Sequence, residues 1–232
     1  MADVGMVECY EPLKNEAMLA HAEFQLWDEL YATHPGRVEI LNATAGGFFA
    51  MLSPILADNV IMRLSRLTDP AGTGKHRNLT LRTLVPFIPG GSPNACAFCR
   101  QLDALDKACG AMRVQRNKRM AHLDFDTATV STTDPLPGVR VSELRHALVV
   151  LQEAMNIFER HHRLPTVMYS DFIHHAGLKR KIAKAVRNST APRKPVSPSC
   201  RYFIAGHVYI RAFILHSGSA ICIMPGCIGI LK

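Results

Sequence analysis

Apolar side chains recur at steps of three and four residues through most of the chain, which is the spacing of one face of an α-helix. Two such stripes are especially regular: Phe98, Leu102, Leu105, Cys109 and Met112, and then Leu144, Leu148, Leu151, Met155 and Phe158. No strand-like alternation of apolar and polar residues stands out before residue 200. The pattern therefore predicts an all-α fold, built as an antiparallel helical bundle.

Breaks in this pattern divide the chain into five expected helices. They are expected over residues 12–33, from the Pro35-Gly36 break to 67, over 78–84, over 93–121 and over 141–163. Ser92 followed by Pro93 is a favourable helix start, because the serine side chain caps the first turn and proline needs no hydrogen bond there. Asn78 is the expected cap of the short third helix.

Charge is distributed unevenly along the chain. Residues 172–232 contain 10 Lys and Arg and no acidic residue, whereas residues 1–171 contain 17 basic and 19 acidic residues. A basic segment beside a nearly neutral body favours contact with nucleic acid or another anionic surface, and a solvated tail is the alternative. The body, residues 10–165, is expected to be one helical domain, followed by a basic segment of unassigned role over residues 176–232.

An uncharged run of 20 residues, Ala212–Leu231, follows the basic stretch. Its length suits a membrane span, but its glycines, its proline and His216 argue against one. We expect a basic, poorly ordered C-terminal appendage. A strand hairpin packed on the bundle and membrane contact stay open as alternatives.

Cysteine usage and short motifs bear on location and cofactors. The chain has seven cysteines without framework spacing and no signal-like N-terminus, so a reduced, cytoplasmic location is expected. Cys96 and Cys99 have the spacing of a metal or redox pair, but no second pair follows. Gly72–Lys75 resembles a phosphate-binding loop, yet it lacks the first glycine and the final hydroxyl residue of that motif. We therefore expect no metal and no cofactor.

The stretch with the most distinctive chemistry ends the fourth predicted helix and reads Arg116-Asn117-Lys118-Arg119-Met120-Ala121-His122-Leu123-Asp124. Arg116 is the next position of an apolar stripe, where a guanidinium group needs an anion or a carboxylate beside it. His122 is the side chain that exchanges protons most readily near neutral pH. One interpretation is structural, with Arg116 ion-paired to Asp124 and His122 capping the helix. The other is a catalytic pair.

Helix geometry connects the catalytic interpretation with dimerisation. Six α-helical steps place Arg116 and His122 about 120° apart around the axis and roughly 9 Å apart along it. One chain would not aim both side chains at a single phosphate group. Two antiparallel copies packed through this helix could bring the arginine of one chain to the histidine of the other, so a homodimer with a shared site is expected.

Two further arginines, Arg63 and Arg66, end the second predicted helix just before Asp69. The simpler expectation is that they neutralise Asp69 and the carbonyl groups at the helix end, each pair contributing little to stability. The alternative is that one of them lines an anion-binding site.

The Arg-Asn-x4-His pattern of Arg116 to His122 resembles the motif of the HEPN (higher eukaryotes and prokaryotes nucleotide-binding) superfamily. Three segments sharpen the likeness: residues 63–70 (RLSRLTDP), residues 78–81 (NLTL) and residues 116–124 (RNKRMAHLD). In this order they resemble the HEPN-like domain of the abortive-infection type U proteins of bacteria. The resemblance covers residues 10–165, and the C-terminal segment matches nothing in it.

The resemblance implies a helical bundle that is often dimeric and, in many members, a metal-independent endoribonuclease used as a toxin or in phage defence. It implies that Arg116 stabilises the phosphate, that His122 transfers protons and that Asn117 positions one of these groups. Lys118 and Arg119 would hold flanking phosphates. The implied partners are RNA, a second copy of the chain and a neutralising antitoxin protein. The alternative is a non-catalytic HEPN-like domain that binds RNA or a protein.

Overall fold

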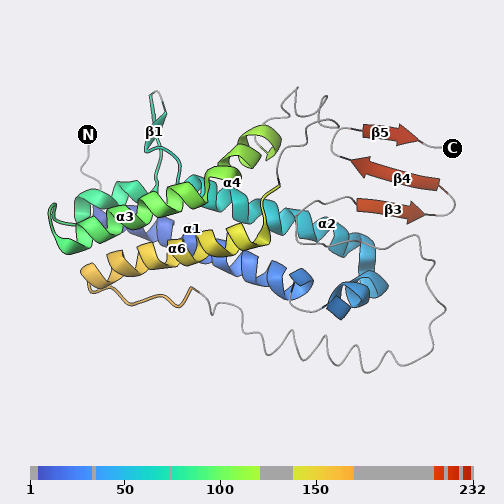
Figure 1. Ribbon diagram of the computed structural model, residues 1–232, viewed down its shortest axis with the longest axis horizontal. Coiled ribbons are helices and arrows are strands. Elements are labelled where there is room, and N and C mark those ends of the chain that lie inside the picture. The colour runs from blue at the N-terminus through green and yellow to red at the C-terminus, as the bar shows by residue number, and fades with distance from the viewer. Residues whose placement is uncertain are drawn as a thin grey trace.

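The computed structural model describes residues 5–32, 35–73, 75–120 and 138–169, together with three short strands near the C-terminus (Figure 1). Its helices are α1 (Met6–Trp27), the π-helix η1 (Asp28–Ala32), α2 (Pro35–Leu67), the 3-10 helix η2 (Leu81–Phe87), α3 (Pro93–Ala108), α4 (Gly110–Gln115), the π-helix η3 (Arg116–Met120) and α6 (Val141–His161). Its strands are β1 (Gly72–Thr73), β2 (His76–Arg77), β3 (Ala212–His216), β4 (Ser219–Met224) and β5 (Cys227–Ile230).

The body of the protein is a bundle of four long helices. Helix α1 packs against α2, and α3 packs against α6, with α1 also contacting α6 (Figure 1). Because the connection between α1 and α2 is short, these two helices run in opposite directions. The prediction of an all-α bundle is confirmed for this body.

The two regular apolar stripes form the centre of the core. Every residue of both stripes is buried, and the stripe on α3 and α4 packs across from the stripe on α6. Phe24 and Trp27 at the end of α1, and Leu30 and Tyr31 in η1, are buried in the same core. Each fully buried large side chain contributes about 1.5–3 kcal/mol relative to an exposed one, so burial of these residues stabilises the bundle.

Two predicted helix starts differ from the structure. Helix α1 begins at Met6 rather than near residue 12 and continues through Pro12, because Cys9 and Tyr10 in its first turns are buried in the core. The short helix expected over 78–84 is a 3-10 helix that starts at Leu81. Asn78 does not cap it: the Asn78 amide Nδ2 donates instead to the carbonyl of Pro70 at 2.9 Å. Tertiary contacts have overridden the local signal at both places.

The helix expected over 93–121 is confirmed at its start and divided further along. The Ser92 hydroxyl accepts the backbone N–H of Ala95 at 3.1 Å, as predicted for a cap. The α-helix then ends at Ala108, restarts at Gly110 and changes to π-helical hydrogen bonding from Arg116. Apolar burial continues through these changes because Cys109 and Met112 stay in the core.

Helix α2 is half outside the core. Val60, Leu64 and Leu67 are buried, whereas Met51 and Ile55 in the preceding turns are 62% and 51% exposed. The helix is kinked at Ala45, and its first half extends past the bundle (Figure 1). Within the part of the chain that the structure describes, α2 is long and apolar enough to cross a membrane, and 17% of its most apolar window is buried.

The uncharged C-terminal run contains a three-stranded antiparallel sheet in the order β3-β4-β5. Ile214 pairs with Ile221, and Ile223 pairs with Ile228. This pairing satisfies the backbone of the strands, and the β-branched isoleucines favour the extended conformation. Residues 170–211, which include the basic linker, lie outside the described part of the chain.

A buried carboxyl group joins three parts of the bundle. Glu159 of α6 is fully buried and accepts hydrogen bonds from the hydroxyl of Tyr10 at 3.0 Å, the hydroxyl of Tyr169 at 2.7 Å and the backbone N–H of Val167 at 3.2 Å. Burial, with the Glu159 carboxylate beside them, raises the pKa of Tyr10 and of Tyr169 above the ordinary tyrosine value. Both hydroxyls therefore stay protonated and act as donors that hold α1 and the segment after α6 in place.

His21 makes the stability of this bundle dependent on pH. Its ring is buried and packs against Tyr169, with ring centroids 5.4 Å apart. Burial lowers its pKa from 6.5 to about 4, although a hydrogen bond to the Leu148 backbone acts in the opposite direction. Because the unfolded chain takes up this proton more readily, the free energy of unfolding falls as pH drops from 6.5 towards 4.

We expect the protein to lose about 2 kcal/mol of stability between pH 7 and pH 5 through His21. Replacing His21 with phenylalanine keeps a ring at this place and removes the titration, so the variant should lose that part of the pH dependence. Urea denaturation at pH 7, 6 and 5 measures the effect. His146→Gln, an exposed position on α6, is the control and should behave like wild type. An equal pH slope in His21→Phe and wild type would contradict the expectation.

Candidate functional site

Arg116 stands where the backbone changes from the α-helix α4 to the π-helix η3. Its side chain is 18% exposed, and its Nη1 atom donates to Oδ2 of Asp69, at the turn that follows α2. Its Nε atom donates to Oδ1 of Asn117 at 3.0 Å. The expectation of an ion-paired arginine is confirmed, but the partner is Asp69, and Asp124 lies outside the described residues.

These two contacts fix the orientation of the Arg116 guanidinium group but use only two of its N–H donors. A guanidinium has five N–H donors, so three remain without a partner among the residues that the structure describes. The second carboxylate oxygen of Asp69, Oδ1, is buried and has no hydrogen-bond partner there either. A guanidinium held from one side by a carboxylate, with free donors on the other, is an arrangement that binds a phosphate.

The arginines that were expected to neutralise Asp69 have other partners. Arg63 donates to Glu23 through Nε at 2.8 Å and to Glu16 through Nη1 at 2.7 Å, both on α1. The Nη1 atom of Arg66 lies 3.9 Å from Oε1 of Glu16. The expected pairing with Asp69 is therefore wrong, because the carboxylates of α1 lie closer. Arg63 is engaged by two carboxylates, which leaves it poorly suited to line an anion site.

The three segments that characterised the sequence meet in space around the turn after α2. Residues 63–70 supply Asp69, and residues 116–120 supply the Arg116 that binds it. The segment 78–81 joins them through Asn78, whose backbone N–H donates to the carbonyl of Ala71 at 2.9 Å and whose side chain binds Pro70. Parts of the chain that are about 50 residues apart thus form one hydrogen-bonded unit.

Arg113 strengthens this unit and was missed by the sequence analysis. Its Nη1 atom donates to the hydroxyl of Thr68 at 2.9 Å, and its Nη2 atom donates to the carbonyl of Asp106 at 2.8 Å. Arg113 and Arg116 therefore bind adjacent parts of the same turn. Their spacing of three residues, which puts both on one helix face, was the available signal.

The π-helix η3 carries the polar and basic residues that follow Arg116 in the motif. Asn117, Lys118 and Arg119 are exposed in this turn. Burial raises the pKa of Asp58 on α2, and the charge of Arg119 opposes that rise, so Arg119 is within electrostatic range of α2. π-helical turns are rare and occur frequently at functional sites.

This turn also changes the geometric argument for a shared site. The angle of about 120° between Arg116 and His122 assumed an α-helix throughout, and i→i+5 hydrogen bonding over Arg116–Met120 has more residues per turn. The α-helical geometry behind that estimate therefore does not apply over Arg116–Met120. His122 itself lies outside the described residues, so the structure brings together Arg116, Asn117, Lys118 and Arg119 but does not place the histidine.

The other motifs contain no comparable chemistry. Gly72–Arg77 folds as a β-hairpin between helices, which is not the strand-loop-helix setting of a phosphate-binding loop. Cys96 and Cys99 lie free on α3, and no cluster of three metal-ligating side chains occurs in the described part of the chain.

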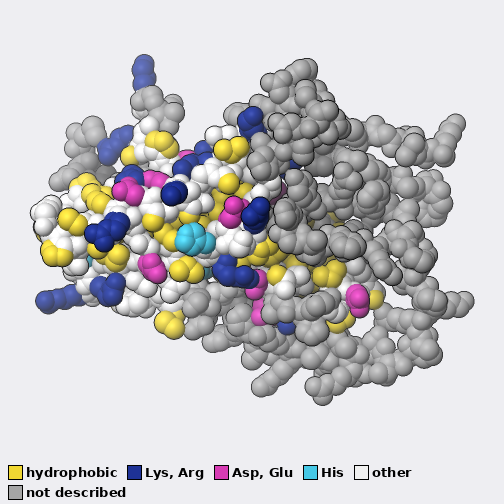
Figure 2. Space-filling view, viewed as in Figure 1, with side chains coloured by type: hydrophobic (Ala, Val, Ile, Leu, Met, Phe, Trp, Pro, Cys, Tyr) yellow, Lys and Arg dark blue, Asp and Glu magenta, His cyan; other side chains and the backbone are white. Residues whose placement is uncertain are grey.

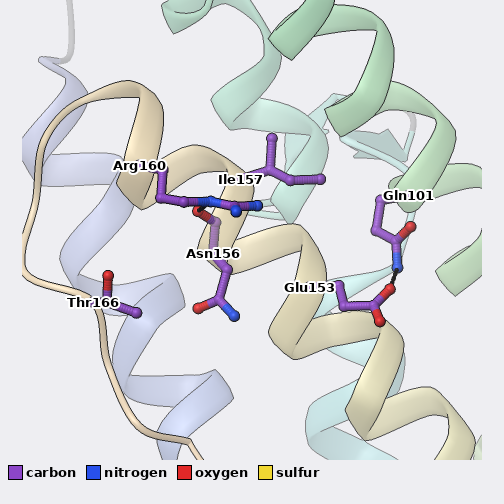
Figure 3. A pocket seen from close by; sticks show the side chains of 6 residues that line it. All are labelled: Gln101, Glu153, Asn156, Ile157, Arg160 and Thr166. Atoms are coloured by element: carbon purple, nitrogen blue, oxygen red, sulfur yellow. Dashed lines mark hydrogen bonds between the residues drawn. The ribbon is translucent and has the colours of Figure 1, made fainter.

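A pocket of about 330 Å³ lies between α3 and α6 (Figure 3). It is lined by Gln101, Glu153, Asn156, Ile157, Arg160 and Thr166. Gln101 donates to Glu153 at 2.6 Å and Arg160 donates to the backbone carbonyl of Asn156 at 3.1 Å, while the side-chain Oδ1 of Asn156 is buried without a hydrogen-bond partner among the described residues. It contains none of the candidate residues.

Comparison with known families identifies the family of the chain. The family model HEPN_AbiU2, described as AbiU2, matches residues 6–184, which is more than half of the chain and includes every segment that meets at the site. No curated protein and no solved structure shows significant similarity to the chain. The match extends from α1 into the basic stretch beyond residue 165. The chain therefore belongs to the HEPN_AbiU2 family of HEPN-like, abortive-infection type U domains.

Proposed function

We propose that this protein is a metal-independent endoribonuclease of the HEPN type, acting in the cytoplasm as a toxin or phage-defence effector. The observation that supports this most directly is the orientation of Arg116. Asp69 and Asn117 hold its guanidinium group, and its other donors have no partner among the described residues, beside a π-helical turn that exposes Lys118 and Arg119. Membership of the family makes RNA the expected target of such a site.

In the proposed reaction the ribose 2′-oxygen attacks the adjacent phosphorus, and the bond to the 5′-oxygen of the next nucleotide breaks. His122 takes the 2′-OH proton as general base or gives a proton to the leaving oxygen as general acid. Arg116 stabilises the charge that builds on the phosphate oxygens. Asn117 positions Arg116 through its Oδ1 contact, and Lys118 and Arg119 hold neighbouring phosphates. The products are a 2′,3′-cyclic phosphate and a free 5′-OH.

The direct test is incubation of the purified protein with single-stranded RNA in EDTA, because a flexible single strand can align its 2′-OH with the leaving oxygen. We expect cleavage that leaves 2′,3′-cyclic phosphate ends. Binding without cleavage by the folded protein would instead favour the second candidate, a non-catalytic HEPN-like domain that binds RNA or a partner protein. The pairing of Arg116 with Asp69 is the observation that favours this second candidate, since the arginine already has an anionic partner.

We further propose that the active form is a homodimer whose sites combine Arg116 of one chain with His122 of the other, and that an antitoxin protein restrains it. Mixing tests the shared site. Arg116→Ala and His122→Ala should each be inactive alone, but a mixed dimer retains one intact site if the two residues come from different chains. After subunit exchange we expect about a quarter of wild-type activity, because half of randomly formed dimers are mixed and each has one working site.

The control for this mixing experiment uses the double variant, Arg116→Ala with His122→Ala, in place of His122→Ala. Mixing this double variant with Arg116→Ala produces no dimer with an intact site. An inactive mixture of the two single variants, shown by light scattering to contain exchanging dimers, would mean that each site is built within one chain.

A further inference from the structure

The β1–β2 hairpin, Gly72–Arg77, projects from the bundle directly after the turn that holds Asp69. Its two short strands pair in the register Gly72 with Arg77 and Thr73 with His76. In Figure 1 it rises from the same side of the bundle as α4, which leads into η3. Figure 2 shows a Lys or Arg side chain at the tip of this projection and others along the adjoining side of the bundle.

The hairpin is positively charged and open to solvent. Lys75 and Arg77 are both exposed, and neither has an acidic partner among the described residues. Other arginines of this region, such as Arg63 and Arg82, are each paired with two carboxylates. The cations of the hairpin therefore remain free to attract an anion.

The base of the hairpin is fixed to the candidate site. The backbone N–H of Asn78 binds the Ala71 carbonyl and its side chain binds the Pro70 carbonyl, which closes the hairpin next to Asp69. Arg113 and Arg116 attach the same turn to α4 and η3 through Thr68 and Asp69. A short hairpin clamped in this way presents its two cations at a set position relative to Arg116.

We propose that the β1–β2 hairpin is a second RNA-binding arm, in which Lys75 and Arg77 bind backbone phosphates of the strand whose cleaved phosphate lies at Arg116. This inference rests on the proposed ribonuclease function and adds a contact outside the motif. Free cations on a fixed projection beside a phosphate site suit a polyanion whose charges repeat at regular spacing. Each phosphate that the hairpin neutralises releases counterions, so its contribution is recognisable from salt dependence.

The test is RNA binding as a function of salt, measured by fluorescence anisotropy with a labelled single-stranded oligonucleotide. All proteins carry His122→Ala, so that the RNA is not cleaved during the titration. Adding Lys75→Gln and Arg77→Gln should weaken binding by roughly tenfold to a hundredfold near 50 mM salt and reduce the salt slope by about 1.4, or about 0.7 for each lost contact. In the cleavage-competent chain the same pair should raise KM and leave kcat nearly unchanged.

The matched control is Arg160→Gln with Arg163→Gln, which removes two exposed positive charges at the far end of α6. It should leave the salt slope unchanged. An unchanged salt slope in the hairpin variant, or an equal change in the control, overturns the proposal. A hairpin that binds a protein partner instead of RNA would give the unchanged slope. If folded wild-type protein neither binds nor cleaves RNA, the ribonuclease proposal itself fails; if it cleaves and only the hairpin slope is unchanged, the hairpin proposal alone fails.

Discussion

Replacing His122 with alanine is expected to reduce RNA cleavage in EDTA by about 10²–10⁴-fold, which is the usual contribution of a positioned proton-transfer group. The loss should appear in kcat, because RNA is held by the basic residues and the proton is transferred only during the reaction. The measurement is the rate of cleavage of a single-stranded RNA under single-turnover conditions. The folded state of the variant is checked by its denaturation midpoint.

Arg116 distinguishes the catalytic interpretation from the structural one. We expect Arg116→Ala to lose activity on the same scale as His122→Ala, since its guanidinium stabilises charge that develops in the transition state. Arg116→Lys keeps the charge but loses the planar fork that reaches both Asp69 and a phosphate, so it should recover little activity. A structural arginine would behave differently: lysine would restore most of the activity in proportion to the stability it restores.

Arg63→Lys is a useful comparison for these variants. Arg63 binds Glu16 and Glu23 on α1 and has no assigned role in the reaction, so its effect on cleavage reports on stability alone. Full activity of both His122→Ala and Arg116→Ala in EDTA would remove the proposed mechanism, whatever RNA is used.

Replacing Glu159 with leucine is expected to lower the free energy of unfolding by about 3–5 kcal/mol. The substitution leaves the hydroxyls of Tyr10 and Tyr169 and the N–H of Val167 buried without their acceptor, and each such donor costs about 1–3 kcal/mol. Urea denaturation at pH 7 measures the difference. Glu153→Leu, on an exposed position of the same helix, is the control and should change stability by less than about 1 kcal/mol.

A second substitution, Tyr169→Phe, distinguishes the loss of the acceptor from a simple loss of packing, because its effect on the free energy of unfolding should depend on whether Glu159 is present. Tyr169→Phe should destabilise the wild-type protein, because it removes a buried hydrogen bond to Glu159. In the Glu159→Leu background the same change should be neutral or stabilising, because it removes a donor that no longer has a partner. Additive losses in the double variant would show that the carboxyl group is not the acceptor on which these donors depend.

The periodicity of the chain was enough to predict its helices and most of its core. The stripes on α3, α4 and α6 are buried at every predicted position. Apolar residues at a regular helical spacing all lie on one face of the helix, and that face packs into the core. Local signals failed where a tertiary contact competed with them. Asn78 resembles a helix cap but closes the β1–β2 hairpin. Met51 and Ile55 continue an apolar pattern on α2, yet their side chains are exposed.

The residues of the candidate site could be chosen from the sequence, since Arg116, Asn117, Lys118 and Arg119 are consecutive, and the family model matches the part of the chain that contains them. What the sequence could not give is which acid binds which arginine. Asp69 was assigned to Arg63 and Arg66, its neighbours in the chain, yet it binds Arg116, 47 residues away, and Arg63 binds α1 instead.

The sequence by itself thus determined the helices, the buried stripes and the residues of the motif, because helix formation and residue chemistry depend on neighbours within one or two turns. Only the tertiary structure decided the ion pairs, the π-helical turn at Arg116 and the fixing of the hairpin beside Asp69. These depend on distances between segments that the packing of α2 against α1 and α4 sets, and no local pattern encodes such distances.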